Sequence, residues 1–276
     1  MQVVESVSTL RSLLGAQSAI AFVPTMGNLH EGHVALVREA RKRGRIVVAS
    51  IFVNRLQFGP TEDFDRYPRT FAADCEKLAS EGVDYVFAPD EKVLFPQPQD
   101  FFVTPNPELA DMLEGAFRPG YFRGVATIVA KLFNIVAPAQ AIFGMKDYQQ
   151  LRVIERMVAQ LNMPIAIQPY PTIRASDGLA LSSRNNYLSE SERAEAPNLH
   201  RVMRAISVAV QAGETAIAEL EAKATAELAG RGWQVDYITV RRRSDLKVQE
   251  GGNAPLVVLS AARIGKTRLI DSLEID

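Results

Sequence analysis

Strand-like and helix-like segments alternate along the chain from Ser18 to Gln168. The run Ile46–Val53, IVVASIFV, is almost continuously apolar, which is typical of a parallel strand covered by helices on both faces. The expected strands are Ser18–Val23, Ile46–Val53, Asp84–Ala88, Ala141–Phe143 and Ile165–Gln168, and the expected helices are Gly32–Arg43, Thr70–Ser80, Phe122–Val136 and Asp147–Asn162. Strands separated by helices predict a parallel, right-handed α/β sheet.

The pattern changes after Pro171. Ser189 and Glu192 form a capping box that is expected to open a long helix, and Glu214–Ala229 predicts another. Three strand-like runs follow, at Trp233–Val240, Leu256–Ala261 and Thr267–Glu274. We therefore expect a Rossmann-like α/β domain over residues 1–171 that binds ATP and substrate, and a smaller C-terminal α+β lid domain over residues 172–276.

The bulk composition narrows the possible partners. A net charge of −1 gives no indication of nucleic acid or of an anionic membrane surface. No segment reaches the roughly 18 apolar residues of a membrane helix, and the first residues lack the features of a secretion signal, so we expect a cytoplasmic protein. Cys75 is the only cysteine, which excludes an intrachain disulfide. Its spacing with Phe71 and Leu78 predicts a buried structural thiol on the apolar side of a helix.

Two of the three histidines, His30 and His33, lie in the stretch TMGNLHEGHVALV at residues 25–37, where a strand is expected to end and a helix to begin. Ligands of open α/β sheets bind at the carboxyl ends of the strands, and a helix N-terminus favours phosphate. Residues three apart share a helix face, so both imidazoles can stabilise charge on a phosphoryl group. A metal site is the weaker interpretation because no third histidine or cysteine is near.

Other phosphate-binding motifs are absent or incomplete. The sequence has no G-x-G-x-x-G, and Gly265-Lys266-Thr267 lacks the P-loop glycine because Ser260 stands there, so we expect a hairpin turn. A second group of donors lies in IRASDGLALSSRNNYLS, at the expected domain junction, where a mobile loop can close over a triphosphate. Its members are Arg174, Ser182, Ser183, Arg184 and Asn185. For this group the alternative is an ordinary solvated loop. Lys146 follows another expected strand end, and for it the alternative is an ordinary exposed lysine.

Several motifs together resemble one family. They are PTMGNLHEGH, SIFVN, QF, DFDRYPRT, MLEGAFRPGYFRGVATIVAKLFNIV, FGMKDYQQL and DGLALSSRNNYLS, with RLID at residues 268–271. In this order they resemble the pantothenate synthetase (pantoate–β-alanine ligase) family, which belongs to the H-x-G-H nucleotidyltransferase superfamily.

The resemblance implies an ATP-dependent condensation of (R)-pantoate with β-alanine in two half-reactions. Pantoate attacks the α-phosphate of ATP to give pantoyl adenylate and pyrophosphate, and β-alanine then gives pantothenate and AMP. ATP is a substrate, and Mg²⁺ is expected to travel with its phosphates, so no protein ligand set for the metal is predicted. Asp74 is the carboxylate that could contribute a ligand to Mg²⁺, but we do not predict that it does. A homodimer is implied by the family alone.

The resemblance also implies roles for individual residues. The expected ATP contacts are Met26, Gly27, Asn28, Leu29, His30, Glu31, Gly32, His33, Gly144, Met145, Lys146, Asp147, Ile173, Leu181, Ser182, Ser183 and Arg184. The catalytic candidates are His33, His30, Lys146 and Arg184, and charge stabilisation is favoured over proton donation for His33. Gln57 and Gln150 are expected to bind pantoate, Gln57 near β-alanine as well, with Asn54 lining the pocket.

The sequence departs from the family pattern at two positions, and two other functions are weighed against the ligase. Met145 stands where the family often has an acidic residue, and Arg55 stands where it commonly has a proline. A nucleotidyltransferase with a phosphate-bearing acceptor would require more cationic residues than Asn54, Gln57 and Gln150 provide. A catalytically silent nucleotide-binding module is disfavoured because the four catalytic candidates are all retained.

Overall fold

The computed structural model describes residues 1–15, 19–60, 62 and 64–276, which divide into two compact units. The first comprises Met1–Gly144 and Val153–Tyr170, and the second comprises Met145–Arg152 and Pro171–Asp276. The boundary expected from the sequence, at residue 171, places Met145–Arg152 with the first domain, whereas the structure groups this segment with the second unit. The roles assigned to the two domains stay predictions.

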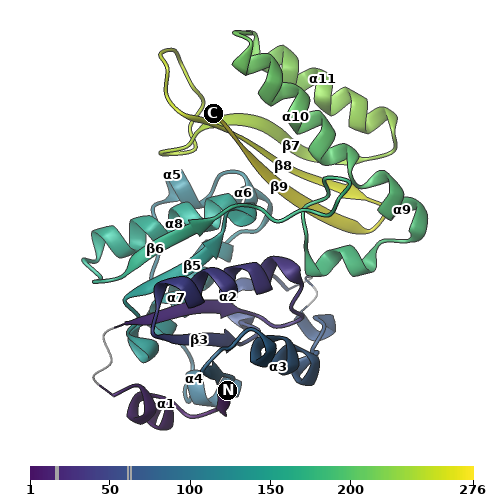
Figure 1. The fold of residues 1–276 in the computed structure, drawn as a ribbon. Coiled ribbons are helices and arrows are strands. Elements are labelled where there is room, and N and C mark those ends of the chain that lie inside the picture. Colours follow the sequence, from purple (N-terminus) through teal and green to yellow (C-terminus); the bar gives the residue numbers. More distant parts are fainter. Residues whose placement is uncertain (16–18, 61, 63) are drawn as a thin grey trace. The chain divides into compact units, whose positions relative to one another are not determined.

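The described part of the first unit contains a six-stranded sheet in the order β1-β4-β3-β2-β5-β6. Figure 1 labels three of its strands, β3, β5 and β6. Every neighbouring pair is parallel, which confirms the predicted α/β class. The strands are β1 Gln2–Val4, β2 Ile20–Thr25, β3 Ile46–Ile51, β4 Tyr85–Phe87, β5 Gln140–Gly144 and β6 Ala166–Tyr170. Residue 18, where the second of these strands was expected to begin, lies outside the described residues.

Helices flank this sheet. They are α1 Val7–Leu14, α2 Glu31–Arg43, α3 Phe71–Ser80, α4 Glu91–Leu94, α5 Pro107–Ala110, α6 Glu114–Phe117, α7 Tyr121–Val136 and α8 Tyr148–Gln160, of which α8 has its first five residues in the second unit, together with the 3₁₀ turns η1 Arg55–Gln57 and η2 Phe64–Arg66. The expected helices correspond to α2, α3, α7 and α8. The elements β1 and α1 were not predicted.

The central strands β2, β3 and β5 are buried on both faces, as the apolar run of β3 predicts. On one face Val37 and Ala40 of α2 pack in a cluster with alternate residues of the central strands, such as Val23. The neighbouring residue Phe22 points to the other face, where its ring lies 6.4 Å from that of Phe133 on α7. Burial on both faces leaves the strand ends as the place where this sheet can present polar groups.

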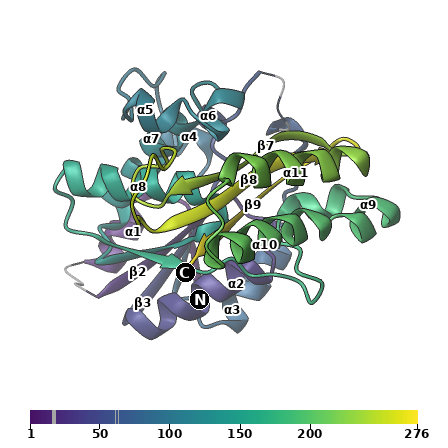
Figure 2. The ribbon, with the colours of Figure 1, turned by 90° about the horizontal axis from the view of Figure 1, so that it is seen from above.

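The second unit contains a three-stranded antiparallel sheet, β7 Gln234–Arg242, β8 Leu256–Ile264 and β9 Thr267–Ile275. Figure 2 shows α10 and α11 lying along this sheet. The helices and 3₁₀ turns of this unit are α9 Glu190–Glu195, α10 Asn198–Gln211, α11 Ile217–Gly230, η3 Met145–Asp147 and η4 Ser183–Tyr187. Ile264 pairs with Thr267 across a tight turn in which Gly265 has φ +53°, so the predicted hairpin is confirmed.

Two sequence-based expectations are wrong. The long helix after Ser189 is broken, because α9 ends at Glu195 and α10 begins after Pro197, which has no N–H to continue the first helix. The capping box itself is confirmed. On α3 the buried residues are Asp74 and Leu78, while Cys75 is half-buried, so its thiol is not part of a buried apolar face. Among the described residues, no helix is long and apolar enough to cross a membrane.

Candidate active site

The stretch that holds the two histidines connects β2 to α2. From β2 the chain adds β3 and β4 on one side and then returns to add β5 on the other side of β2. This reversal is the topological switch point of the sheet, and ligands of open α/β sheets bind outside the strand ends at such a point. The loop Met26–His30 therefore occupies the position that the fold favours for a ligand.

The main chain of this loop is held by the protein itself. Thr25 Oγ1 donates to the carbonyl of Ser50 at 2.6 Å and accepts the N–H of Gly27 at 3.2 Å. Asp74 accepts the N–H of Asn28 through Oδ2 and that of Leu29 through Oδ1, each at 2.8 Å. These bonds fix the backbone conformation of the residues that precede His30.

The two histidines cap α2. His30 is the N-cap residue, and its Nδ1 accepts the N–H of Gly32 at 3.1 Å. The Nδ1 of His33 accepts the N–H of His30 at 3.3 Å, so the two side chains complete a reciprocal capping box, with ring centroids 4.1 Å apart. A nitrogen that accepts a hydrogen bond carries no proton, so each neutral ring holds its proton on Nε2. The cap thereby makes both rings Nε2–H donors.

The expectation of open main-chain donors at this helix N-terminus needs correction. The N–H groups that donate within the protein are those of Gly27, Asn28, Leu29, His30, Gly32 and His33. Most main-chain donors of this loop are thus engaged, and the ring Nε2–H groups of His30 and His33 are candidate donors to a phosphate. Any contact of Asn28 or Leu29 with ATP uses atoms other than their N–H groups.

Asn54 and Gln57 lie just beyond the end of β3, and Asn54 is 1% exposed. Asn54 Nδ2 donates to Gln57 Oε1 at 3.0 Å and to the carbonyl of Gly124 at 3.2 Å. Gln57 Nε2 in turn lies 3.2 Å from the sulfur of Met26. The structure thus brings two of the three predicted substrate residues together with the start of the histidine loop.

The turn that carries Asn54 and Gln57 packs directly on a helix backbone. A Cβ at Gly124 of α7 would lie 2.1 Å from the carbonyl oxygen of Leu56, closer than any real contact. Arg55, which replaces a proline of the family pattern, contacts Glu91 at 3.1 Å and stacks its guanidinium 3.9 Å from the ring centroid of Phe64. The turn is therefore held from two sides without the proline.

In the second unit, the predicted ATP segment Met145–Asp147 forms η3. The Lys146 ammonium lies 3.1 Å from Asp147 Oδ2, and the Lys146 side chain is 17% exposed. Ser272 Oγ donates to the carbonyl of Met145 at 2.6 Å, so β9 holds this turn in place. Gln150 lies on the first turn of α8, three residues beyond Asp147.

The remaining predicted ATP residues of this unit lie on a short hairpin. The N–H of Leu181 donates to the carbonyl of Ile173 at 2.9 Å, and Arg174 and Ala180 form a β-bridge. The hairpin leads into η4, whose N-cap Ser182 accepts the N–H of Arg184 at 3.3 Å. The structure therefore brings Ile173, Leu181 and Ser182 together, with Ser183 and Arg184 on the turn that follows.

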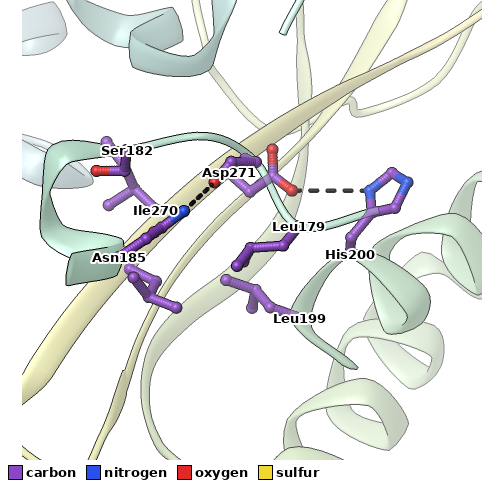
Figure 3. Close-up of a pocket in the computed structure, with 9 residues that line it drawn as sticks. Leu179, Ser182, Asn185, Leu199, His200, Ile270 and Asp271 are labelled. Carbon is purple, nitrogen blue, oxygen red and sulfur yellow. Dashed lines mark hydrogen bonds and ion pairs between the residues drawn. The ribbon is translucent and has the colours of Figure 1, made fainter. Parts of the chain in front are cut away.

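Arg174, one of the expected cationic donors, is bound within the second unit. Its two guanidinium nitrogens donate to Asp271 Oδ2 and Oδ1 at 2.6 and 2.9 Å. Figure 3 shows Asp271 facing His200, whose Nδ1 lies 3.7 Å away, beside a small pocket. Burial raises the pKa of the Asp271 carboxyl, but His200 and Arg174 more than offset this, so the pKa lies below its usual value. Arg184 is left as the cationic candidate of this loop.

Sequence reasoning did not foresee the roles of Asp74 and Asp271. Asp74 lies 45 residues from Leu29, and Asp271 lies 97 residues from Arg174, so no local spacing signals either contact. Among the described residues, no group of three or more His, Cys, Asp or Glu side chains is arranged to hold a metal ion.

Comparison with known proteins decides the family. The model of the pantoate–β-alanine ligase family matches residues 2–274. The chain belongs to this family. A pantothenate synthetase from Nitrosospira multiformis is 55% identical over 275 residues, covering 100% of this chain and 98% of the relative.

Solved structures of pantoate–β-alanine ligases share the fold. A pantothenate synthetase from Thermus thermophilus is 43% identical with a TM-score of 0.94, covering 100% of this chain and 99% of that one. A ligase from Francisella tularensis, in complex with βγ-ATP and β-alanine, is 32% identical with a TM-score of 0.85, covering 99% and 97%. As a member of this family, the protein is a ligase, and the predicted fold class and enzyme class are confirmed.

Proposed function

We propose that the protein condenses (R)-pantoate with β-alanine at the expense of ATP, through a pantoyl adenylate, to give pantothenate, AMP and pyrophosphate. The family match over residues 2–274 supports the overall reaction, and the ATP and β-alanine bound to the Francisella ligase agree with it. The histidine capping box is the observation that carries the mechanism, because it presents two ring donors where the sheet favours a ligand.

In the first half-reaction the pantoate carboxylate attacks the α-phosphorus of ATP, and the bond from that phosphorus to the α,β-bridging oxygen breaks, so this oxygen leaves with its electron pair as part of pyrophosphate. Negative charge grows on the phosphoryl oxygens and on the leaving group. Neutral His30 and His33, each with its proton on Nε2, donate to these oxygens and stabilise that charge. No proton has to be transferred, because a carboxylate replaces a phosphate oxygen.

Lys146 and Arg184 serve in this proposal as cationic partners of the departing pyrophosphate. A guanidinium offers paired donors that match phosphate oxygens, and an ammonium offers a compact charge. Mg²⁺ bound to the phosphates would neutralise part of their charge, and it needs few protein ligands because it keeps most of its waters.

Pantoate recognition falls to neutral amides, which hydrogen-bond hydroxyl and carboxylate oxygens without neutralising the nucleophile. Gln57 and Gln150 are the proposed contacts. Asn54 donates to both Gln57 and the carbonyl of Gly124, so its role is to hold the Gln57 amide in one orientation. In the second half-reaction the free amine of β-alanine attacks the acyl carbon and expels AMP.

Oligomeric state and location belong to the same proposal. The family resemblance supports a homodimer that acts in the cytoplasm on small-molecule substrates, with no nucleic acid and no membrane as partner. Light scattering coupled to size-exclusion chromatography would measure the mass of the particle, and a value of one chain would refute the dimer.

Exchange of labelled pyrophosphate into ATP tests the adenylate route. Reversible adenylation requires only ATP, Mg²⁺ and pantoate, so exchange is expected before any β-alanine is added. A route through pantoyl phosphate would release ADP and show no exchange. A nucleotidyltransferase with a phosphate-bearing acceptor would exchange only with that acceptor. Absence of pantoate-dependent exchange, in a protein that binds both ligands, would refute the proposed mechanism.

A further inference from the structure

Asp74 is a fully buried carboxylate beside the histidine loop, with a relative exposure of 0%. It lies in the first turn of α3, a helix from which no residue was predicted to take part in the reaction. A buried carboxylate is costly unless its oxygens accept several hydrogen bonds. Asp74 accepts three, from the N–H groups of Asn28 and Leu29 and from the hydroxyl of Thr70 at 3.0 Å.

Both polar groups of the Leu29 main chain are bound by α3. Its N–H donates to Asp74 Oδ1, and its carbonyl accepts Lys77 Nζ at 2.6 Å. Leu29 directly precedes His30, the residue that begins the capping box. The helix α3 thus fixes the peptide that sets the direction of the histidine pair.

The loop has an uncommon backbone conformation that the bonds to α3 stabilise. Gly27 and Asn28 both have positive φ, at +81° and +51°. Glycine and asparagine are the residues that enter the left-handed region most readily, and the hydrogen bond from the Asn28 N–H to Asp74 helps to hold this conformation. A Cβ at Gly27 would lie 3.1 Å from Asp74 Oδ2, which shows how closely the carboxylate approaches the loop.

We propose that Asp74 is a positioning residue for the adenylation step. It acts through the main chain of residues 28 and 29, which place His30 and His33 against the phosphates, and it does not touch ATP. This inference rests on the proposed function. Its carboxylate oxygens are engaged by main-chain and hydroxyl donors, which distinguishes this role from that of a Mg²⁺ ligand.

The variant Asp74→Asn tests the proposal. An amide of the same shape can accept only one of the two N–H groups and turns its own N–H toward the other. We expect kcat/KM for ATP in pantoate-dependent pyrophosphate exchange to fall about 10- to 100-fold, the scale of one charge-assisted hydrogen bond. Aminolysis of pantoyl adenylate by β-alanine should stay within about threefold, because pyrophosphate has already left, the bonds change at the acyl carbon, and the departing AMP keeps its α-phosphorus unattacked.

Asp84→Asn is the matched control. Asp84 Oδ2 also accepts a main-chain N–H, that of Val47 at 2.8 Å, but at the amino end of β3, away from the strand ends that face the ligand. This variant should lower the free energy of unfolding, while the ratio of the rates of the two half-reactions should stay as in the wild type. Hydrogen exchange of the Asn28 and Leu29 amides should accelerate in the Asp74 variant and not in the Asp84 variant.

Three outcomes would overturn the inference. They are unchanged exchange activity in folded Asp74→Asn, equal losses in both half-reactions, and a loss that excess Mg²⁺ restores, which would indicate a metal ligand. If Asp74→Asn does not fold, Lys77→Met decides, because it removes only the bond to the Leu29 carbonyl. A selective loss of adenylation of about two- to fivefold supports the proposal; an unchanged ratio refutes it. Lack of exchange in the wild type would count against the proposed function instead.

Discussion

Substitution of His33 separates the two tasks that its ring performs. One ring nitrogen, Nδ1, accepts the N–H of His30 at 3.3 Å and so caps α2, while Nε2–H is the proposed donor to the phosphates. His33→Ala removes both. His33→Gln removes the imidazole but keeps a side-chain oxygen at the third helical position, where glutamine is a favoured partner in capping boxes.

The expected magnitudes differ for the two tasks. Loss of a side-chain cap costs about 1 kcal/mol of stability, so His33→Ala should lower the free energy of unfolding by that amount and His33→Gln should restore most of it. Loss of a transition-state donor costs about 10²- to 10³-fold in rate, and this should appear in both variants. ATP affinity should fall much less, because the charge on the phosphoryl oxygens is greatest in the transition state.

The assays are urea denaturation, calorimetric titration with ATP and single-turnover formation of pantoyl adenylate. Wild type and His33→Gln should both have a higher free energy of unfolding than His33→Ala. Both variants should form pantoyl adenylate more slowly than the wild type. Near-normal adenylation in His33→Gln would show that the ring only caps the helix. An equal loss of ATP affinity and rate would show that it binds the ground state as strongly as the transition state.

Three further predictions address other parts of the molecule. Gln150→Ala should raise the KM for pantoate far more than that for ATP, since an unpaired polar group costs roughly 1–3 kcal/mol; equal steady-state effects on both would indicate a structural role. Cys75→Ser should keep kcat within a few-fold of wild type, because burial and, to a lesser degree, the charge of Asp74 raise the pKa of the thiol and keep it protonated at neutral pH; inactivation of a folded variant would contradict this. Because the pKa of Asp271 is lowered in the folded state, its ionic contribution to stability is present above the ordinary value of 3.8 and is lost as pH falls through the folded value. The difference in unfolding free energy between wild type and Asp271→Asn should therefore shrink between about pH 5 and pH 3, and a constant difference would refute the role of the charge.

The sequence predicts long elements well because their apolar periodicity is strong. The stripe on α7 and the apolar run of β3 were both located within two residues of their observed ends. The strand β1 has three residues, too few to show any period, and it exists because β4 supplies its partner. The break between α9 and α10 was missed because the capping box at Ser189 outweighed the stop signal of Pro197.

The candidate site shows the same division between local and distant information. His30 and His33 could be placed at a helix start from the motif alone, since strand, loop and helix are contiguous. The use of their Nδ1 atoms as caps, and the use of Asp74 to hold the loop, depend on geometry that the spacing does not encode. Sequence reasoning therefore found the residues expected to contact the ligand and missed those that hold them.

The contact between Gly124 and the carbonyl of Leu56 bears on how variants of this enzyme are interpreted. A single methyl group at this position has no room, and the segment it would displace carries Asn54 and Gln57. Such a variant would mimic a substrate-site mutation in kinetic screens, although residue 124 offers no side chain to any ligand. A survey of tolerated substitutions would then rank this glycine beside the substrate-binding residues. Its position on the helix shows that substitutions are excluded there because a side chain has no room, and not because it would contact a ligand.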